Sequence, residues 1–348
     1  MTKKTKEDDC VVATLNNEKI KLIGRYYQSA ESLRCEFTAS GFEFRAHLSG
    51  KIKINCKVDE SSDCKMCHVG IIVNGDFENM SDLCLKVGET SFIAADDLAE
   101  GEHLVRIVKL DEFSKTRIDF FSIEFDGELL EKPADRPLKF EFYGDSLTCG
   151  YGALSKTHET PNPFPALEHG YRTYAALLAN HFGAELTVVA ASGNGILCDF
   201  GGGPNVLRNY YDKAAPVENI KWDFGKYTPD AVFFNIGTND YNFAKNSKTA
   251  ADGDALANEL ESIVSDVVSH YPGCKLFFVY GINDAPLKCE YADIPSVYER
   301  LHEKFKNSYI ITDIACNQLG GDWHPSVEDH KLVFDKIMAH FKEQNISF

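Results

Sequence analysis

The chain has 348 residues, of which 44% are hydrophobic and 26% charged, which is typical of a soluble globular protein with room for two domains. Its net charge of −17 repels nucleic acids and anionic membranes, so we expect neither as a partner. No stretch approaches the length of a membrane-spanning helix, and the polar, lysine-rich start does not resemble a secretory signal, which favours a cytoplasmic location.

The cysteines favour a reducing compartment. There are eleven, an odd number, and they are scattered rather than evenly spaced, so we expect free thiols. Cys64 and Cys67 form a lone Cys-x-x-Cys pair without a second pair or suitably spaced histidines, so no metal site is expected there.

The first third of the chain alternates apolar and polar residues with a period of two. The run that contains Phe42, Phe44, Ala46 and Leu48 is one example. Turn residues separate such runs at Ser40–Gly41, Ser49–Gly50, Asn74–Gly75, Glu100–Gly101 and Asp126–Gly127. This pattern predicts short antiparallel strands that form a β-sandwich over residues 1–134, with a proline-containing linker at residues 131–137.

From residue 135 to residue 348 the pattern changes to continuous apolar runs separated by helical periodicity. The runs are Leu138–Tyr143, Leu186–Ala190, Ala231–Ile236, Leu276–Tyr280 and Tyr309–Ile314. They predict five buried parallel strands flanked by helices, with Asp252 or Asp254 and Ser326 as helix caps. The long irregular stretch at residues 196–229 is typical of a wall or lid beside a functional site.

Four of these strands are followed by residues that suggest chemistry. The motifs are Gly144-Asp145-Ser146-Leu147, Ala191-Ser192-Gly193-Asn194, Gly237-Thr238-Asn239-Asp240 and Asp322-Trp323-His324-Pro325. Loops at the carboxyl ends of parallel strands converge on one edge of the sheet. A nucleophilic serine needs a base, a group that orients the base, and donors for the oxyanion, and these motifs hold residues of each kind.

In this order and spacing, the four motifs resemble the SGNH (or GDSL) hydrolases over roughly residues 137–345. The preceding sandwich and the sequence Asp-Trp-His-Pro-Ser narrow the resemblance to carbohydrate esterase family 2, whose members remove acetyl groups from xylan and related polysaccharides. The resemblance implies a jelly-roll-like sandwich followed by a flavodoxin-like α/β domain. It also implies that Ser146 is the nucleophile and His324 the base. The oxyanion donors would be the backbone N–H groups of Ser146 and Gly193 and the side-chain amide of Asn239, with no metal or cofactor.

Two residues beside His324 leave alternatives open. Most SGNH hydrolases carry an aspartate three positions before the histidine, where this chain has Gly321. Asp322 could orient His324 through its main-chain carbonyl, as described for some family 2 members, or through its carboxylate. Trp323 could offer a flat face to a sugar ring or acyl group, or serve only in packing.

We therefore expect a serine esterase that removes acetyl groups from xylan-derived or related oligo- or polysaccharides through an acyl-enzyme, and that self-associates into a homo-oligomer. One alternative is an SGNH esterase, lipase or thioesterase that acts on non-sugar acyl groups. Another is a carbohydrate-binding protein with a vestigial hydrolase domain. The sandwich is expected to shape the cleft or to mediate assembly.

Overall fold

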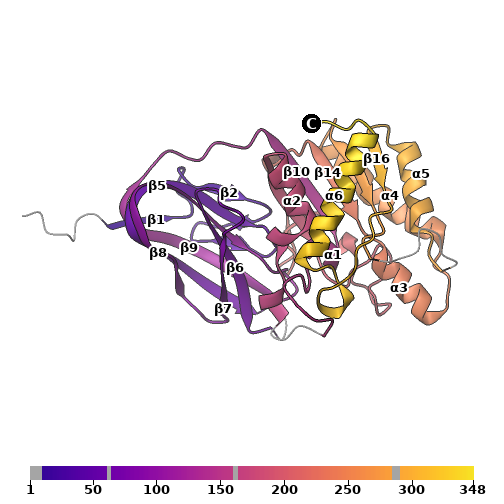
Figure 1. Ribbon diagram of the computed structural model, residues 1–348, viewed down its shortest axis with the longest axis horizontal. Helices are drawn as coiled ribbons and strands as arrows, with labels where there is room; N and C mark the ends of the chain where they lie inside the picture. The colour runs from indigo at the N-terminus through magenta and orange to yellow at the C-terminus, as the bar shows by residue number, and fades with distance from the viewer. Residues whose placement is uncertain (1–9, 61–63, 160–163, 284–290) are drawn as a thin grey trace, which may run out of the picture.

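The computed structural model describes residues 10–60, 64–159, 164–283 and 291–348, which form two parts that lie side by side (Figure 1). The first part is built of antiparallel strands. Its strands are β1 (Cys10–Thr14), β2 (Lys21–Ile23), β3 (Tyr27–Gln28), β4 (Leu33–Cys35), β5 (Gly41–Glu60), β6 (Met66–Val73), β7 (Ser81–Lys86), β8 (Ser91–Lys109) and β9 (Thr116–Leu129).

The predicted antiparallel β-sandwich is confirmed, and three long strands form its centre. β5 pairs with β8 on one edge and with β9 on the other, within the order β3-β4-β9-β5-β8-β6-β7. The inward positions of β5, including Phe42, Phe44 and Ile54, are fully buried, as the period of two predicts.

Three of the predicted turns are wrong, because they lie inside these long strands. Ser49–Gly50 lies within β5, Glu100–Gly101 within β8 and Asp126–Gly127 within β9. The pairing of β5 with β8 shifts register between Leu48 and Gly50, where the backbone of Gly50 has a φ of +77°. Glycine within a strand can mark a β-bulge that bends the strand, and a bulge gives the same sequence signal as a turn.

The second part is an α/β domain. Its sheet contains β10 (Leu138–Gly144), β11 (Ala184–Ala190), β14 (Ala231–Asn235), β15 (Lys275–Val279) and β16 (Ser308–Ile311). A separate hairpin consists of β12 (Lys213–Ala215) and β13 (Ile220–Lys221). The helices are α1 (Ser146–Cys149), α2 (Tyr174–His181), α3 (Thr238–Ser247), α4 (Gly253–His270), α5 (Ile294–Lys304) and α6 (Val327–Glu343).

All five strands of the sheet run parallel in the order β11-β10-β14-β15-β16, which confirms the predicted five-stranded sheet. Side chains on its two faces form separate cores. Phe142, Phe233 and Phe277 stack with neighbouring ring centroids 4.4 and 4.5 Å apart and pack with α2 and α6. The alternate residues Tyr143 and Phe234 pack on the opposite face with α4 and α5.

Two predicted helix starts are confirmed. Asp252, rather than Asp254, caps α4 by accepting hydrogen bonds from two backbone N–H groups. Ser326 caps α6 in a capping box with Asp329. The end of the last predicted strand is wrong, since β16 ends at Ile311 rather than at Ile314.

Buried polar contacts join the two parts. Arg25 of the sandwich is fully buried and donates to Glu141 Oε1 at 3.0 Å and to the Tyr143 hydroxyl at 2.6 Å, both on β10. The ten cysteines within the described residues are all free thiols. Among the helices of the described residues, none has the length and apolar character needed to cross a membrane.

Candidate active site

Ser146 begins the short helix α1 directly after β10. Asp145 is the N-cap, and its Oδ1 accepts a hydrogen bond from the Leu147 N–H at 3.0 Å, which holds the serine turn. Gly150 ends the helix with a φ of +83°, a conformation that favours glycine. The sequence thus fixes the serine in a tight strand–helix turn at the carboxyl end of the sheet.

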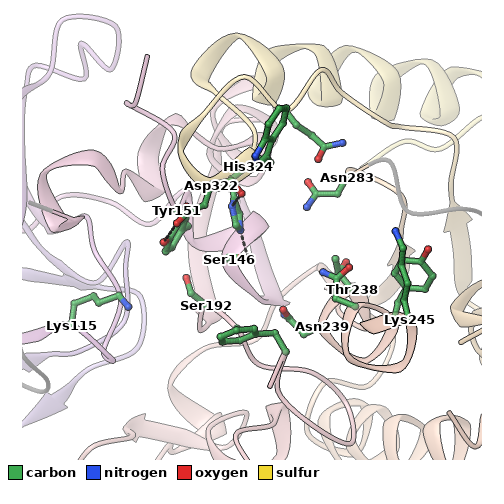
Figure 2. A pocket seen from close by; sticks show the side chains of 16 residues that line it. Lys115, Ser146, Tyr151, Ser192, Thr238, Asn239, Lys245, Asn283, Asp322 and His324 are labelled. Atoms are coloured by element: carbon green, nitrogen blue, oxygen red, sulfur yellow. Dashed lines mark hydrogen bonds between the residues drawn. The ribbon is translucent and has the colours of Figure 1, made fainter. Parts of the chain in front are cut away.

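The strand order brings the predicted oxyanion loops beside Ser146. β10 lies between β11 and β14, and the strand order reverses here, which is where doubly wound sheets form a crevice. Gly193 follows β11 and Asn239 lies just after β14 at the start of α3. All three residues line one pocket of about 620 Å³, together with His324 (Figure 2).

The His324 ring lies next to the Ser146 hydroxyl in this pocket. Its Nε2 lies 2.9 Å from the serine Oγ, the contact drawn as a dashed line in Figure 2. Its Nδ1 lies 3.0 Å from the main-chain carbonyl oxygen of Asp322, to which it can only donate. Burial lowers the pKa of His324 below its ordinary 6.5, while this carbonyl opposes the shift. The imidazole is therefore neutral near pH 7, with Nε2 available to accept the serine proton.

Asp322 uses its carbonyl and its carboxylate for different contacts. The carboxylate Oδ2 accepts a hydrogen bond of 2.6 Å from the Tyr151 hydroxyl. Asp322 and Trp323 both have left-handed backbones, with φ of +50° and +59°. Such a conformation costs about 1–2 kcal/mol per non-glycine residue, and strain of this kind clusters at functional sites. Of the two alternatives left open by the sequence, the carbonyl is the group that contacts the ring.

The predicted oxyanion donors lie in constrained surroundings. Asn239 Nδ2 donates to the Asn194 carbonyl at 2.8 Å and lies 3.4 Å from Asp145 Oδ2. Burial raises the pKa of Asp145 to about 7. Gly193 has a φ of +79°, and a Cβ there would lie 3.2 Å from the Phe200 ring, so glycine suits both the conformation and the space.

Two exposed aromatic side chains line the pocket. Trp323 is 61% exposed, and its ring centroid lies 3.7 Å from that of His158. Phe200 is 65% exposed and comes from the stretch 196–229 that the sequence marked as a wall or lid. The sequence did not single out Phe200, because a lone aromatic residue in a loop has no periodicity to reveal its exposure.

The sandwich also reaches this region, which agrees with one of the two roles expected for it, that of shaping the cleft, although the sequence did not single out the residue involved. Lys115, in the loop between β8 and β9, lines the pocket opposite Lys245 (Figure 2).

A buried cluster of possible metal ligands lies beside the serine helix. It consists of Glu112, Cys149 and Glu168, and it is the one cluster of three such side chains within the described residues whose ligand atoms are close enough to hold a metal ion. Burial raises the pKa of the Cys149 thiol well above its ordinary value, which disfavours the thiolate that a metal would need.

Comparison with known proteins agrees with this architecture. Residues 142–340 match the model of the GDSL-like lipase/acylhydrolase family, and residues 22–133 match the carbohydrate esterase 2 N-terminal model. The fold is similar to that of a family two carbohydrate esterase from Clostridium thermocellum, solved in complex with cellohexaose. The TM-score is 0.82 at 26% identity, covering 93% of this chain and 98% of that one.

Two curated relatives are similar in sequence. The cellulase/esterase CelE of Acetivibrio thermocellus is 29% identical over 265 residues, which are 71% of this chain and 31% of that protein, so the chain spans about a third of its length. An acetylxylan esterase / glucomannan deacetylase of Cellvibrio japonicus is 26% identical over 265 residues, with 72% of this chain and 71% of that protein covered. The predicted resemblance is confirmed: the chain belongs to the GDSL-like lipase/acylhydrolase family, with an N-terminal domain of the carbohydrate esterase 2 type.

Proposed function

We propose that the chain is a carboxylic ester hydrolase that removes acetyl groups from acetylated oligo- or polysaccharides such as those derived from xylan. The observation that carries the proposal is the continuous contact from Ser146 Oγ to His324 Nε2 and from His324 Nδ1 to the Asp322 carbonyl, within a pocket at the switch point of the sheet. The esterase names of the relatives support the same chemistry.

In the first half of the reaction, His324 Nε2 takes the proton of Ser146 while Oγ bonds to the acetyl carbonyl carbon. The N–H groups of Ser146 and Gly193 and the Asn239 amide stabilise the oxyanion. Asn239 Nδ2 would donate to the oxyanion in place of its 3.4 Å contact with Asp145 Oδ2. The bond from carbon to the sugar oxygen then breaks, and His324 returns the proton to that oxygen as the sugar leaves.

In the second half, a water molecule attacks the acetyl group on Ser146, and His324 takes the proton of the water. Collapse of this second oxyanion breaks the bond to Oγ, which recovers its proton from His324, and acetate leaves. The general acid–base steps of both half-reactions are carried out by His324. Because a neutral carbonyl orients His324, the imidazolium formed in each step is stabilised less than it would be beside a carboxylate.

The sugar specificity rests on the exposed Trp323 and Phe200 rings, which offer apolar faces on which sugar rings can stack. Acetate release from acetylated xylo-oligosaccharides is the test, beside a short-chain and a long-chain aryl ester, for wild type and Ser146→Ala. We expect serine-dependent release of acetate and refusal of the long chain. Turnover of the long chain alone would instead support a lipase, and failure on every substrate would contradict the esterase.

A further inference from the structure

The loop between β8 and β9 brings a buried carboxylate of the sandwich against the α/β domain. The loop packs on this domain through the Leu110 carbonyl, which accepts a hydrogen bond from the Gly170 N–H at 3.0 Å. Glu112 lies two residues further on and is fully buried. A buried carboxylate is costly unless it is paired and hydrogen-bonded, so its partners indicate what it stabilises.

The partners of Glu112 come from both domains. Its Oε2 accepts a hydrogen bond from the backbone N–H of Ser192 and a weaker one from the Cys149 Sγ at 3.6 Å. Its Oε1 lies 3.4 Å from the Nζ of Lys115, an ion pair within the sandwich loop. One side chain thus joins the sandwich both to the serine helix and to the loop after β11.

Ser192 directly precedes Gly193, whose N–H we propose as an oxyanion donor. Glycine restricts the backbone less than any other residue, so the direction of that N–H depends on what anchors the chain on either side. On the far side, the Gly193 carbonyl accepts a hydrogen bond from the Phe200 N–H at 3.0 Å. On the N-terminal side of Gly193, the backbone is anchored by the hydrogen bond that the Ser192 N–H donates to the Glu112 carboxylate.

We propose that Glu112 is a positioning residue for the esterase: its carboxylate holds the Ser192 backbone so that the Gly193 N–H points at the oxyanion formed at Ser146. The sandwich then completes the active site rather than serving as a separate binding module. This inference rests on the ester hydrolysis proposed above. It predicts that shortening the side chain at 112 impairs catalysis even when the negative charge is kept.

Two conservative variants separate the effect of side-chain length at position 112 from the effect of its charge. Glu112→Gln keeps an acceptor oxygen at the same distance from Ser192 but loses the charge, whereas Glu112→Asp keeps the charge but withdraws it by one methylene. Asp111→Asn is the matched control, because Asp111 is equally buried in the same loop but, among the described residues, accepts hydrogen bonds from sandwich groups alone. These donors belong to Cys67, His68, Lys109 and Thr116.

The measurement is kcat and KM for 4-nitrophenyl acetate, with thermal unfolding of each variant in parallel. Loss of one oxyanion donor costs about 10²–10³ in kcat, so we expect Glu112→Asp to lose about 10²-fold in kcat with KM little changed. Glu112→Gln should stay within about tenfold of wild type, because its amide oxygen still accepts from Ser192. Asp111→Asn should keep the wild-type kcat below its melting temperature.

A wild-type kcat in Glu112→Asp would overturn the inference. An equal loss of kcat in Glu112→Gln and Glu112→Asp would also overturn it, as would a change in Glu112→Asp that is confined to KM. A purely structural role would lower the melting temperature of all three variants and leave kcat unchanged. An inactive wild-type protein would instead contradict the proposed function, so the two failures are distinguishable.

Discussion

The main-chain carbonyl of Asp322, rather than its carboxylate, contacts the ring of His324. The variant Asp322→Asn tests whether the carbonyl is enough to orient His324 for catalysis. The substitution removes the charge but leaves the carbonyl that lies 3.0 Å from Nδ1. Asparagine tolerates the left-handed backbone as aspartate does, so the turn with a φ of +50° is retained. Its amide oxygen can still accept the hydrogen bond from the Tyr151 hydroxyl.

The expected loss is therefore small. Replacing an orienting carboxylate in a serine triad lowers kcat by about 10⁴-fold, because the imidazole is held in the wrong tautomer. Here the carbonyl fixes the tautomer, and we expect kcat to fall by less than about tenfold. Exchanging a charged hydrogen bond with Tyr151 for a neutral one should lower the free energy of unfolding by about 1 kcal/mol.

The pH dependence gives a second readout for Asp322→Asn. Burial, the largest influence, lowers the pKa of His324, while the carbonyl and the charge of Asp322 raise it. Neutral His324 is the active base, so activity is present above its pKa and is lost as the pH falls through it. The acid limb of kcat/KM should lie below pH 6.5 in the wild type and lower still in the variant.

The assay is the pH profile of kcat/KM for 4-nitrophenyl acetate, with Tyr151→Phe as the control that removes the hydrogen bond between Tyr151 and Asp322 but keeps the carboxylate. A loss approaching about 10⁴-fold in Asp322→Asn alone would identify the carboxylate, rather than the carbonyl, as the orienting group. An acid limb that moves to higher pH in Asp322→Asn would also contradict it.

Three further substitutions test the oxyanion hole, the exposed tryptophan and the contact between the two domains. Asn239→Ala should lower kcat by about 10²–10³-fold with little change in KM, and an unaltered kcat would exclude its amide from the oxyanion hole. Trp323→Ala should raise KM for acetylated xylo-oligosaccharides but not for 4-nitrophenyl acetate. Its free energy of unfolding should stay within about 0.5 kcal/mol of wild type because the side chain is exposed. Equal effects on KM for both substrates would argue against sugar stacking. Arg25→Met should lower the free energy of unfolding by about 3–5 kcal/mol in denaturant titrations, since Glu141 is left buried without this partner, and a loss below 1 kcal/mol would contradict this.

The α/β domain was largely predictable from the sequence because its signals are local. Short continuous apolar runs bounded by turn residues are typical of strands buried on both faces, and four of the five runs are followed by a loop that carries a site residue. The convergence of Ser146, Gly193, Asn239 and His324 on one pocket then follows from the general rule that parallel strands present their carboxyl ends on one edge.

Other features depend on contacts that the sequence does not encode locally. The register shift at Ser49–Gly50 and the turn at Asn74–Gly75 each place a small polar residue before a glycine, and only the pairing partners distinguish them. The contact between Glu112 and Ser192 joins residues 80 positions apart on different domains, and no spacing or periodicity marks it. The choice between the carbonyl and the carboxylate of Asp322 depends on one backbone turn, which alternation along an extended chain could not decide.

The proposed mechanism requires Ser146 to be the nucleophile and His324 to activate it. The most direct measurement is reaction with an aryl fluorophosphonate, followed by peptide mapping and residual esterase activity on 4-nitrophenyl acetate. We expect one phosphonyl group per chain on Ser146, loss of activity in proportion to labelling, and much slower labelling in His324→Ala. Complete inactivation with the label on another residue, or wild-type activity in Ser146→Ala, would contradict it.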